Sequence, residues 1–368
     1  MGLSIKVKIP CNQIGFPSNK GKKPTLPIES RRIAVRYDDI GITVLKPDID
    51  HIAFGFSFKP ELLKKYKSSQ NIAAFEKNVS QTLFHAAKTN ANGLSMVEGV
   101  PFLKKPWVNY NLNIRYRPNK STEAIFIQAS PKNPDSNLDF MRFVMNPSRY
   151  DKSDFKAFRV FVEELLVCPD ACISYEDFLI WSQIYRADVA VDILGARPAD
   201  LEITTLVSGK ASPKKKHIYK SATGRAETIY PGAKKGKSSG SYIYDKRKEQ
   251  EENGHQPLYG DFLHSRFECR ISKTTFHKLA NCTNRCGRVA VRALDPKLFA
   301  KEHYTRQLFI RYALERTLDK ALAVIPPKYQ PKFLKSYNGA MRDIWDAKHL
   351  WSFWKHTVKT SGFFAADK

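Results

Sequence analysis

The sequence has no long apolar run. No stretch approaches the roughly 20 consecutive apolar residues that a helix needs to span a lipid bilayer, although 42% of the 368 residues are hydrophobic. The first residues, MGLSIKVKIPCNQIGF, also lack the apolar core of a secretory signal peptide. We therefore expect a cytoplasmic protein that has no membrane partner.

Cysteine is scarce, with six residues in the chain. Four of them form two pairs with C-x3-C spacing, Cys168 with Cys172 and Cys282 with Cys286. Zinc sites more typically show C-x2-C pairs or a histidine pair. Buried thiols one helical turn apart explain the spacing equally well, so the sequence favours reduced cysteines over a structural zinc site.

Acidic residues are few relative to basic ones. The chain has 61 Lys and Arg against 36 Asp and Glu, a net charge of +25 and a pI near 9.7. So basic a surface repels itself unless a polyanion neutralises it, and bound phosphates release counterions when they meet Lys and Arg. We therefore predict nucleic acid as the partner, with a generic basic surface or an anionic membrane as the alternatives.

The order of the periodic segments predicts an α+β fold. Apolar residues at helical spacing indicate helices over 60–88, 151–168, 174–184 and much of the chain after 296, whereas 197–207 is helical or mixed. Such an order favours a central antiparallel or mixed sheet with helices on one face and a helical C-terminal extension. Alternating, β-branched stretches predict strands over 31–45, 51–58, 107–118, 122–130, 140–147, 184–195, 226–232, 240–246 and 265–272.

Composition divides the chain into three parts. Residues 1–30 are rich in Pro, Lys, Gly and Ser and predict an extended basic arm. Residues 31–280 are predicted as the main domain, with halves 31–150 and 151–280. Residues 281–368 are predicted as a helical C-terminal region.

A Gly-Lys-Ser at residues 236–238 raises the question of a nucleotide-binding loop. The loop pattern G-x-x-x-x-G-K-[ST] needs a glycine five residues before Gly236, where this chain has Pro231. The segment that follows, SYIYDK, is a predicted strand, whereas such a loop precedes a helix. We therefore predict a basic turn that grips phosphates, and the lysines predicted to contact DNA are Lys214, Lys215, Lys216, Lys234, Lys235 and Lys237.

The strand-like segment RADVAVD carries two acids. Asp188 and Asp192 point to one face of the strand, with valines on the other. Two carboxylates on one face of a buried strand are costly to desolvate, and a divalent cation would relieve that cost. The alternative is that one acid faces solvent or pairs with Arg186 or Arg197.

The segment YIYDK places Tyr242 and Tyr244 on one face of a strand, with Lys246 just after them. A tyrosine hydroxyl can attack a phosphodiester when it is polarised and a cation takes up the phosphate charge. The alternative is an ordinary edge strand whose aromatic side chains pack together.

In the segment RFECR, Glu268 shares a strand face with Arg266 and Arg270. An acid between two arginines is either part of a salt-bridge ladder or a metal ligand beside cations that bind phosphate. The segment alone favours neither reading.

Taken in order, four segments resemble a known family. They are R-x-D-x-A-x-D from Arg186, E-T-x-Y-x-G from Glu227, Y-I-Y-D-K-x-x-E from Tyr242 and R-F-E-x-R from Arg266, and the upstream RFVMNPSRYD is similar as well. The resemblance is to the trans-acting replication initiation proteins of rolling-circle plasmids and filamentous phages, and it covers residues 105–275. It implies that 31–280 is a replication-initiator nickase domain with a relaxase-like fold and that 151–280 is its catalytic half.

The resemblance also implies a reaction. Such proteins nick one strand of a double-stranded origin, so both double-stranded and single-stranded DNA are implied as partners. A tyrosine attacks the phosphodiester and keeps the 5′ phosphate, leaving a free 3′ hydroxyl, while Mg²⁺ or Mn²⁺ polarises the phosphate. Carried over, the nucleophile is Tyr244, with Tyr242 as its rival, and Lys246 is a phosphate-binding or leaving-group-assisting cation. The metal ligands are Asp188 or Asp192 and Glu268, and Arg266 and Arg270 are expected to contact DNA.

One departure agrees with this reading. Many rolling-circle nickases hold their metal with a His-x-His pair, and none occurs among the nine histidines here, whereas the trans-acting group uses carboxylates. The flanking regions match nothing recognisable; they are hypothesised to read the origin duplex or contact a host helicase, and a homodimer is left open.

Two other functions stay open on the sequence. The first is a basic DNA-binding regulator that performs no chemistry and whose acids are structural. The second is a metal-dependent hydrolytic nuclease that uses Asp188, Asp192 and Glu268 to activate water.

Overall fold

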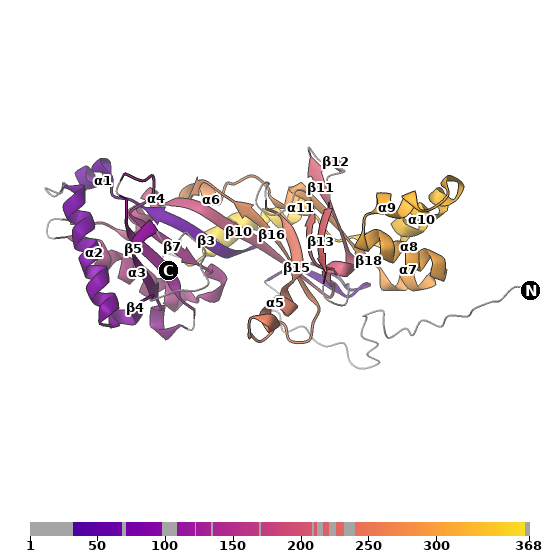
Figure 1. The fold of residues 1–368 in the computed structure, drawn as a ribbon, viewed down its shortest axis with the longest axis horizontal. Coiled ribbons are helices and arrows are strands. Elements are labelled where there is room, and N and C mark those ends of the chain that lie inside the picture. The colour runs from indigo at the N-terminus through magenta and orange to yellow at the C-terminus, as the bar shows by residue number, and fades with distance from the viewer. Residues whose placement is uncertain are drawn as a thin grey trace, which may run out of the picture.

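A large antiparallel β-sheet runs through the centre of the molecule in a computed structural model (Figure 1). All strand pairings among the described residues are antiparallel. The predicted α+β class with a central antiparallel sheet is therefore confirmed. The structure describes residues 32–67, 71–97, 109–121, 123–133, 135–168, 171–207, 210–211, 216–220, 226–231 and 240–364.

The strands that carry the predicted site lie next to one another in the middle and at one edge of this sheet. Its central strand β10 (Gln183–Leu194) pairs with β16 (His264–Ile271) on one side and β3 (Asp48–Phe56) on the other. The strands β1 (Ile33–Tyr37) and β2 (Ile42–Leu45) add a hairpin beside β10. From edge to edge the order is β13 (Lys216–Lys220), β14 (Ala226–Pro231), β15 (Tyr242–Asp245), β16 (His264–Ile271), β10 (Gln183–Leu194), β3 (Asp48–Phe56), β7 (Met141–Met145), β6 (Ile125–Pro131), β5 (Tyr110–Tyr116) and β4 (Leu94–Met96).

Apolar residues from one face of the sheet form the core together with helices. Phe54 of β3 lies at its centre: its ring stacks on Phe143 with centroids 5.1 Å apart and meets Phe178 and Phe276 edge-on. Offset and edge-to-face aromatic contacts of this kind add to the stability that burial gives. The helices that contribute to this core are α1 (Pro60–Lys65), α2 (Ile72–Lys88), α3 (Lys152–Leu165), α4 (Tyr175–Trp181) and α6 (Phe276–Leu279).

Two helix starts that the sequence predicted are built as expected. The Asp151 side chain accepts hydrogen bonds from the backbone N–H groups of Ser153 and Asp154 at the start of α3. Ser174 likewise accepts one from the backbone of Asp177 at the start of α4. These caps satisfy backbone donors that have no partner inside the helix, so the boundaries follow from local chemistry.

Three elements differ from the sequence prediction. The segment 60–88 forms two helices because Lys67, with φ of 52°, ends α1 and Asn71 caps α2. The stretch predicted as helical or mixed, 197–207, contains the strand β11 (Leu201–Val207), in line with its β-branched residues. A short helix, α5 (Lys246–Glu252), follows β15 and was not predicted; Asp245 caps it.

The region after residue 280 is not one helical unit. The four helices α7 (Pro296–Lys301), α8 (Tyr304–Glu315), α9 (Leu318–Ala323) and α10 (Gln330–Ala340), here called the C-terminal lobe, have a hydrophobic core of their own. In contrast, α11 (Ala347–Ser352) and α12 (Trp354–Thr360) pack into the main core through Leu350, Trp354 and Val358. The C-terminal lobe is therefore inserted into the chain between elements that pack into the main core.

A second, smaller sheet connects the lobe to the main body. In it β18 (Val289–Leu294) pairs with β11 on one side and β19 (Met341–Asp343) on the other.

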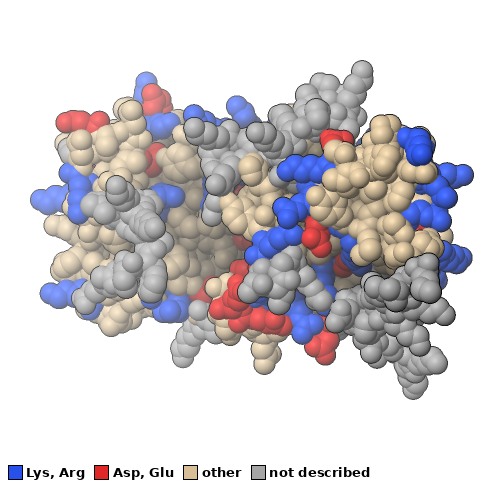
Figure 2. All heavy atoms as spheres, turned by 45° about the vertical axis from the view of Figure 1, so that its right-hand side comes forward, with Lys and Arg blue, Asp and Glu red and all other residues tan. Residues whose placement is uncertain are grey.

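Figure 2 shows Lys and Arg side chains spread over the part of the molecule that the C-terminal lobe forms. Within the described residues, no helix combines the length and the apolar character needed to cross a membrane.

The cysteine pairs do not lie on helices, which corrects one reading of their spacing. Cys168 and Cys172 end the two strands of a small hairpin, β8 (Val167–Cys168) and β9 (Ala171–Cys172). Cys282 lies in the turn after α6, and Cys286 begins a 3₁₀ turn. A three-residue gap therefore reflects turns in both places.

Candidate active site

The polar face of the sheet gathers the predicted site residues. Cross-strand register pairs Asp188 with Arg270 and Asp192 with Arg266 between β10 and β16, and it pairs Tyr242 with Glu268 between β15 and β16. Because side chains alternate along a strand, these residues share one face. The intervening Val189, Val191, Ile243 and Phe267 are buried in the core on the other face, as the alternation predicted for 188–192 and 242–244.

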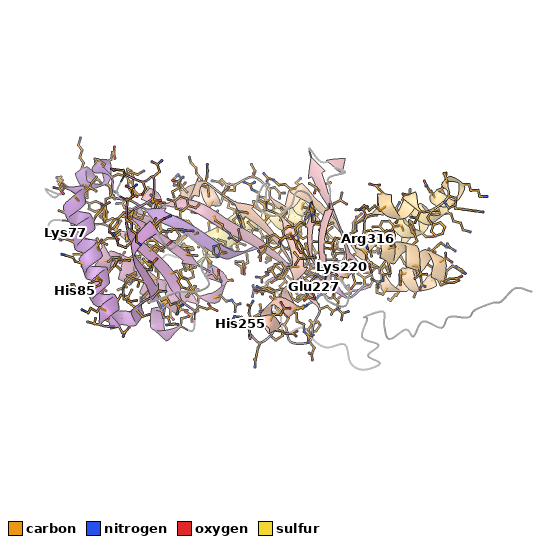
Figure 3. The ribbon with its side chains drawn as sticks, in the orientation of Figure 1. Lys77, His85, Lys220, Glu227, His255 and Arg316 are labelled. Atoms are coloured by element: carbon orange, nitrogen blue, oxygen red, sulfur yellow. The ribbon has the colours of Figure 1, made fainter. Side chains whose placement is uncertain are left out.

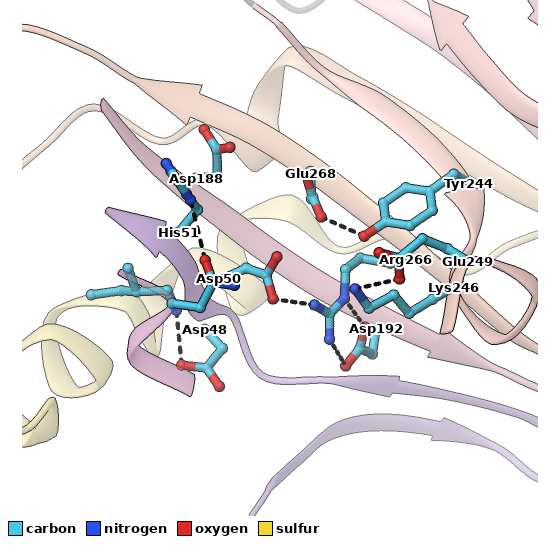
Figure 4. A network of polar contacts seen from close by, with 12 residues as sticks. Asp48, Asp50, His51, Asp188, Asp192, Tyr244, Lys246, Glu249, Arg266 and Glu268 are labelled. Atoms are coloured by element: carbon cyan, nitrogen blue, oxygen red, sulfur yellow. Dashed lines mark hydrogen bonds and ion pairs between the residues drawn. The ribbon is translucent and has the colours of Figure 1, made fainter. Parts of the chain in front are cut away.

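Glu268 accepts hydrogen bonds from both candidate nucleophiles. The Tyr244 hydroxyl donates to Oε1 at 2.6 Å, and the Tyr242 hydroxyl donates to Oε2 (Figure 4 draws the Tyr244 bond). Glu268 itself is 4% exposed. The structure thus brings together three of the residues that the sequence singled out, on a single buried carboxylate.

Burial sets the protonation of this group of three. It raises the pKa of Glu268, and the nearby charge of Asp50 adds to the effect. Burial, followed by the charge of Glu268, raises the pKa values of Tyr242 and Tyr244 well above those of free tyrosine. Both hydroxyls are therefore protonated donors at neutral pH, and the carboxylate that would receive either proton is more basic than an ordinary glutamate.

Asp188 lies in the same cavity and holds two arginines. Arg186 Nε donates to Asp188 Oδ2 at 2.7 Å, and Arg270 Nε donates to Oδ1 at 3.3 Å. Asp188 is buried, whereas Arg270 is exposed and Arg186 is partly exposed. The Asp188 carboxylate therefore orients two guanidinium groups that are still accessible to solvent. A phosphate that enters the cavity could contact them.

Asp192 and Arg266 have a different place, which corrects two predictions. Arg266 Nε donates to Asp192 Oδ1 at 2.6 Å, and His264 Nε2 lies 2.8 Å from the same oxygen. Arg266 also pairs with Asp50 and is only 7% exposed (Figure 4). Asp192 shares the sheet face of Asp188 but does not line the cavity. Arg266 is buried between Asp192 and Asp50 and is therefore not available to DNA.

The charge state of Asp192 fits its place outside the cavity. Burial by itself would raise the pKa of Asp192, but Arg266 and His264 outweigh it and hold the pKa well below its ordinary value. A carboxylate so fully paired has no lone pair directed at the cavity. Of the two aspartates in RADVAVD, Asp188 is the one in position to act.

Lys246 opens helix α5 directly after the two tyrosines. Its side chain is buried, its Nζ pairs with Glu249 Oε2 at 2.8 Å, and it lies 5.6 Å from the centroid of the Tyr244 ring. The cap that Asp245 provides to α5 fixes the backbone at this point. The lysine is thus a cation held near Tyr244, as its position in the sequence suggested.

These groups line a cavity of about 710 Å³. Besides Arg186 and Arg270, two cations that the sequence did not single out, Arg149 and Arg288, line it. Neither forms an ion pair with the carboxylates of the described residues. They are available for an anionic ligand.

The sequence also missed the contribution of β3. Asp50 and His51 line the cavity, and the register places His51 opposite Asp188. His51 Nδ1 lies 3.1 Å from Asn146 Oδ1, and burial followed by Arg186 lowers the pKa of His51. The alternation of the segment that starts at Asp48 indicates a strand, but it does not say which strand that segment pairs with. Only the register of the folded sheet places His51 beside Asp188.

Most of the predicted DNA-contacting lysines lie outside the described residues. Lys214, Lys215, Lys234, Lys235 and Lys237 belong to this group, as does the Gly-Lys-Ser segment that was predicted as a turn. Lys216 begins β13. The strands that flank the turn, β14 and β15, pair antiparallel as predicted.

The cavity offers oxygen donors of the type that Mg²⁺ and Mn²⁺ bind. As the side chains lie, however, the Asp188 oxygens are bound by two arginines and the Glu268 oxygens by two tyrosines. In the described part of the chain, no three His, Cys, Asp or Glu side chains gather as a metal-ligand set. We therefore derive no catalytic step through a metal.

No protein-family model matches the chain, and a search of curated proteins finds no match. The resemblance described above therefore rests on the residues of this chain alone.

Proposed function

We propose that this protein is a DNA nicking enzyme that starts rolling-circle replication by tyrosine transesterification. One observation carries the proposal: two tyrosine hydroxyls share the buried carboxylate of Glu268 in a cavity lined by arginines. Aromatic packing between neighbouring strands would explain the rings, but it does not require a buried carboxylate that both hydroxyls bind.

The proposed step conserves bond energy. Glu268 takes the phenolic proton while the tyrosine oxygen forms a bond to phosphorus, and the bond from phosphorus to the 3′ oxygen breaks. The 3′ oxygen leaves as a hydroxyl with a proton from water, and the 5′ phosphate stays on the tyrosine. Since one phosphodiester replaces another, no ATP is needed, which agrees with the incomplete nucleotide-binding pattern around Gly236.

The cations of the cavity supply the electrostatic part of catalysis. Arg270 and Arg186, which Asp188 orients, line the space that a phosphate would occupy. Arg149 and Arg288, which form no ion pair within the described part of the chain, line it as well. Preorganised cations stabilise the charge that builds up on the phosphate oxygens. Mg²⁺ or Mn²⁺ would add positive charge there only if Asp188 and Glu268 exchanged their arginine and tyrosine partners for the metal.

The test uses DNA of unknown origin sequence. A pool of random single-stranded oligonucleotides labelled at the 3′ end is incubated with the protein in Mn²⁺, Mg²⁺ or EDTA and run on a denaturing gel. We expect labelled protein, because the fragment that keeps the 3′ label is the one joined through its 5′ phosphate. Sequencing of the attached strands identifies the nick site.

The adduct can be mapped to one tryptic peptide. Cleavage after Lys237 and Lys246 yields SSGSYIYDK, residues 238–246, which contains both tyrosines. Fragmentation of this peptide then separates Tyr242 from Tyr244. Cleavage without an adduct would indicate a hydrolytic nuclease instead, and binding without cleavage under any metal would indicate a regulator.

Replacing Glu268 by glutamine is expected to slow adduct formation about 100-fold or more, because the amide cannot take the tyrosine proton. The same change should not lower stability at neutral pH. Burial raises the pKa of Glu268, so the folded state binds its proton more readily than the unfolded state does. The wild type therefore loses stability relative to Glu268→Gln as pH rises above the ordinary glutamate pKa of about 4.3.

Urea unfolding of both proteins at pH 5 and pH 8, alongside adduct rates, measures this prediction. A Glu268→Gln variant that keeps the wild-type adduct rate would remove Glu268 as the proton acceptor. A variant less stable than wild type at pH 8 would contradict the pKa argument.

A further inference from the structure

Four tyrosine rings form a continuous row across three strands at the edge of the sheet. Tyr219 of β13 meets Tyr230 of β14 with ring centroids 5.6 Å apart, Tyr230 stacks on Tyr242 at 5.3 Å, and Tyr242 meets Tyr244 at 5.6 Å. We call these four residues the tyrosine ladder. Its inner end is the pair of hydroxyls bound to Glu268.

Register places the ladder on the polar face of the sheet. The alternate residues Ile218, Ile229 and Ile243 pack into the hydrophobic core, so the tyrosines on either side of them point to the opposite face. Tyr230, Tyr242 and Tyr244 line the cavity. The ladder thus runs from the edge strand into the candidate active site on the side away from the core.

The outer end of the ladder is open. Tyr219 is 45% exposed, and Tyr230 and Tyr242 are partly exposed. Cross-strand aromatic pairs stabilise sheets by themselves, and such stabilisation explains a single pair of rings. It does not explain why four rings form a row on the face away from the core and why three of them line the candidate active site.

The stretch of sequence that contains all four tyrosines is strongly basic, which favours a polyanion as the partner. The segment 210–248 holds twelve Lys and Arg against two acids, Glu227 and Asp245. Glu227 pairs with Lys248, and Asp245 caps α5, so neither acid is free to repel a phosphate. Lys220, next to Tyr219, pairs with Glu315 of the C-terminal lobe and lies near that lobe in Figure 3, where Arg316 is also labelled.

We propose that the tyrosine ladder is a base-stacking track for single-stranded DNA that leads a strand to Glu268. Successive unpaired bases stack on aromatic side chains regardless of sequence, whereas the faces of paired bases are hidden inside a duplex. The inference rests on the proposed nickase function and adds to it the residues on which the unpaired bases stack.

The test is equilibrium binding in EDTA, where no cleavage takes place. Fluorescence anisotropy is measured with a labelled oligothymidylate of about 15 nucleotides, the upper range for such tracks. Tyr219→Ala is expected to bind about tenfold more weakly, while Tyr219→Phe, which keeps the ring, stays within about twofold of wild type.

A matched control and a ligand control separate stacking from charge. Tyr329 of the C-terminal lobe is 48% exposed, much as Tyr219 is, and Tyr329→Ala should bind as wild type does. An abasic oligonucleotide of equal length keeps the phosphates and removes the bases. It should bind wild type at least as weakly as thymidylate binds Tyr219→Ala, because it loses stacking on every ring of the ladder. A duplex of the same length should show no dependence on Tyr219.

The outcomes distinguish the ladder from the nickase itself. Tyr219→Ala binding equal to wild type, or an abasic strand that binds as well as thymidylate, overturns the ladder even if the protein–DNA adduct forms. Ring-dependent binding without any adduct would leave the ladder standing and overturn the proposed nickase. The abasic arm uses wild-type protein, so the test does not depend on the folding of a variant.

Discussion

Changing Tyr244 to phenylalanine is expected to abolish the covalent protein–DNA adduct, with a fall in rate of at least about 1,000-fold, because the attacking oxygen is removed. Tyr242→Phe should reduce the rate by about tenfold or less, since Glu268 loses one of its two hydrogen-bond donors but the nucleophile stays. The double variant should form no adduct at all. Rates are measured with the 3′-labelled strand at saturating protein.

Phenylalanine is the appropriate replacement at both positions. It keeps the ring contacts of Tyr242 with Tyr230 and Tyr244, so DNA binding in EDTA should stay within about twofold of wild type. A large loss in Tyr242→Phe with little change in Tyr244→Phe would assign the nucleophile to Tyr242. An adduct in the double variant would place the chemistry elsewhere in the chain.

Asp192→Asn is expected to lower the free energy of unfolding by about 3 kcal/mol at pH 7, because it leaves Arg266 buried beside a neutral side chain. Asp188→Asn should cost only about 1 kcal/mol, since its partners Arg186 and Arg270 reach solvent. For activity we expect the larger effect from Asp188→Asn: it should slow adduct formation at least about tenfold, because Arg186 and Arg270 are no longer held in place. Urea unfolding and adduct rates on the same two proteins measure both effects.

The stability difference at Asp192 should depend on pH in a defined direction. Arg266 and His264 hold the pKa of Asp192 below its ordinary value, so its contribution is complete above the unfolded pKa of about 3.9 and is lost as pH falls below it. Asp192→Asn should therefore approach wild-type stability only in acid. If Asp188→Asn proves the less stable protein at pH 7, the two roles are assigned the wrong way round.

Local patterns predicted most of the elements on which the site is built. The alternation in RADVAVD and YIYDK placed their polar residues on one face of buried strands, and Ser174 and Asp151 marked helix starts. Prediction failed where the local signal was weak. The strand β18 and the helix α5 are short, and their stability comes from neighbours, from β11 for the one and from the Asp245 cap for the other.

The sequence by itself determined that this protein is strongly basic and that Tyr242, Tyr244, Asp188 and Glu268 lie on strand faces that can carry polar chemistry. Strand alternation sets the face of each residue but not its partner. Only the tertiary structure decided the partners.

Register between strands far apart in the chain made the decisive distinctions. It pairs Asp192 with Arg266 outside the cavity and places His51 opposite Asp188. It also places Glu268 where both tyrosine hydroxyls can bind its carboxylate. It also joined Tyr219 and Tyr230 to the same pair of rings. A pattern of period two repeats identically in every strand, so which strands meet, and at which residue, is fixed by the packing of the whole sheet.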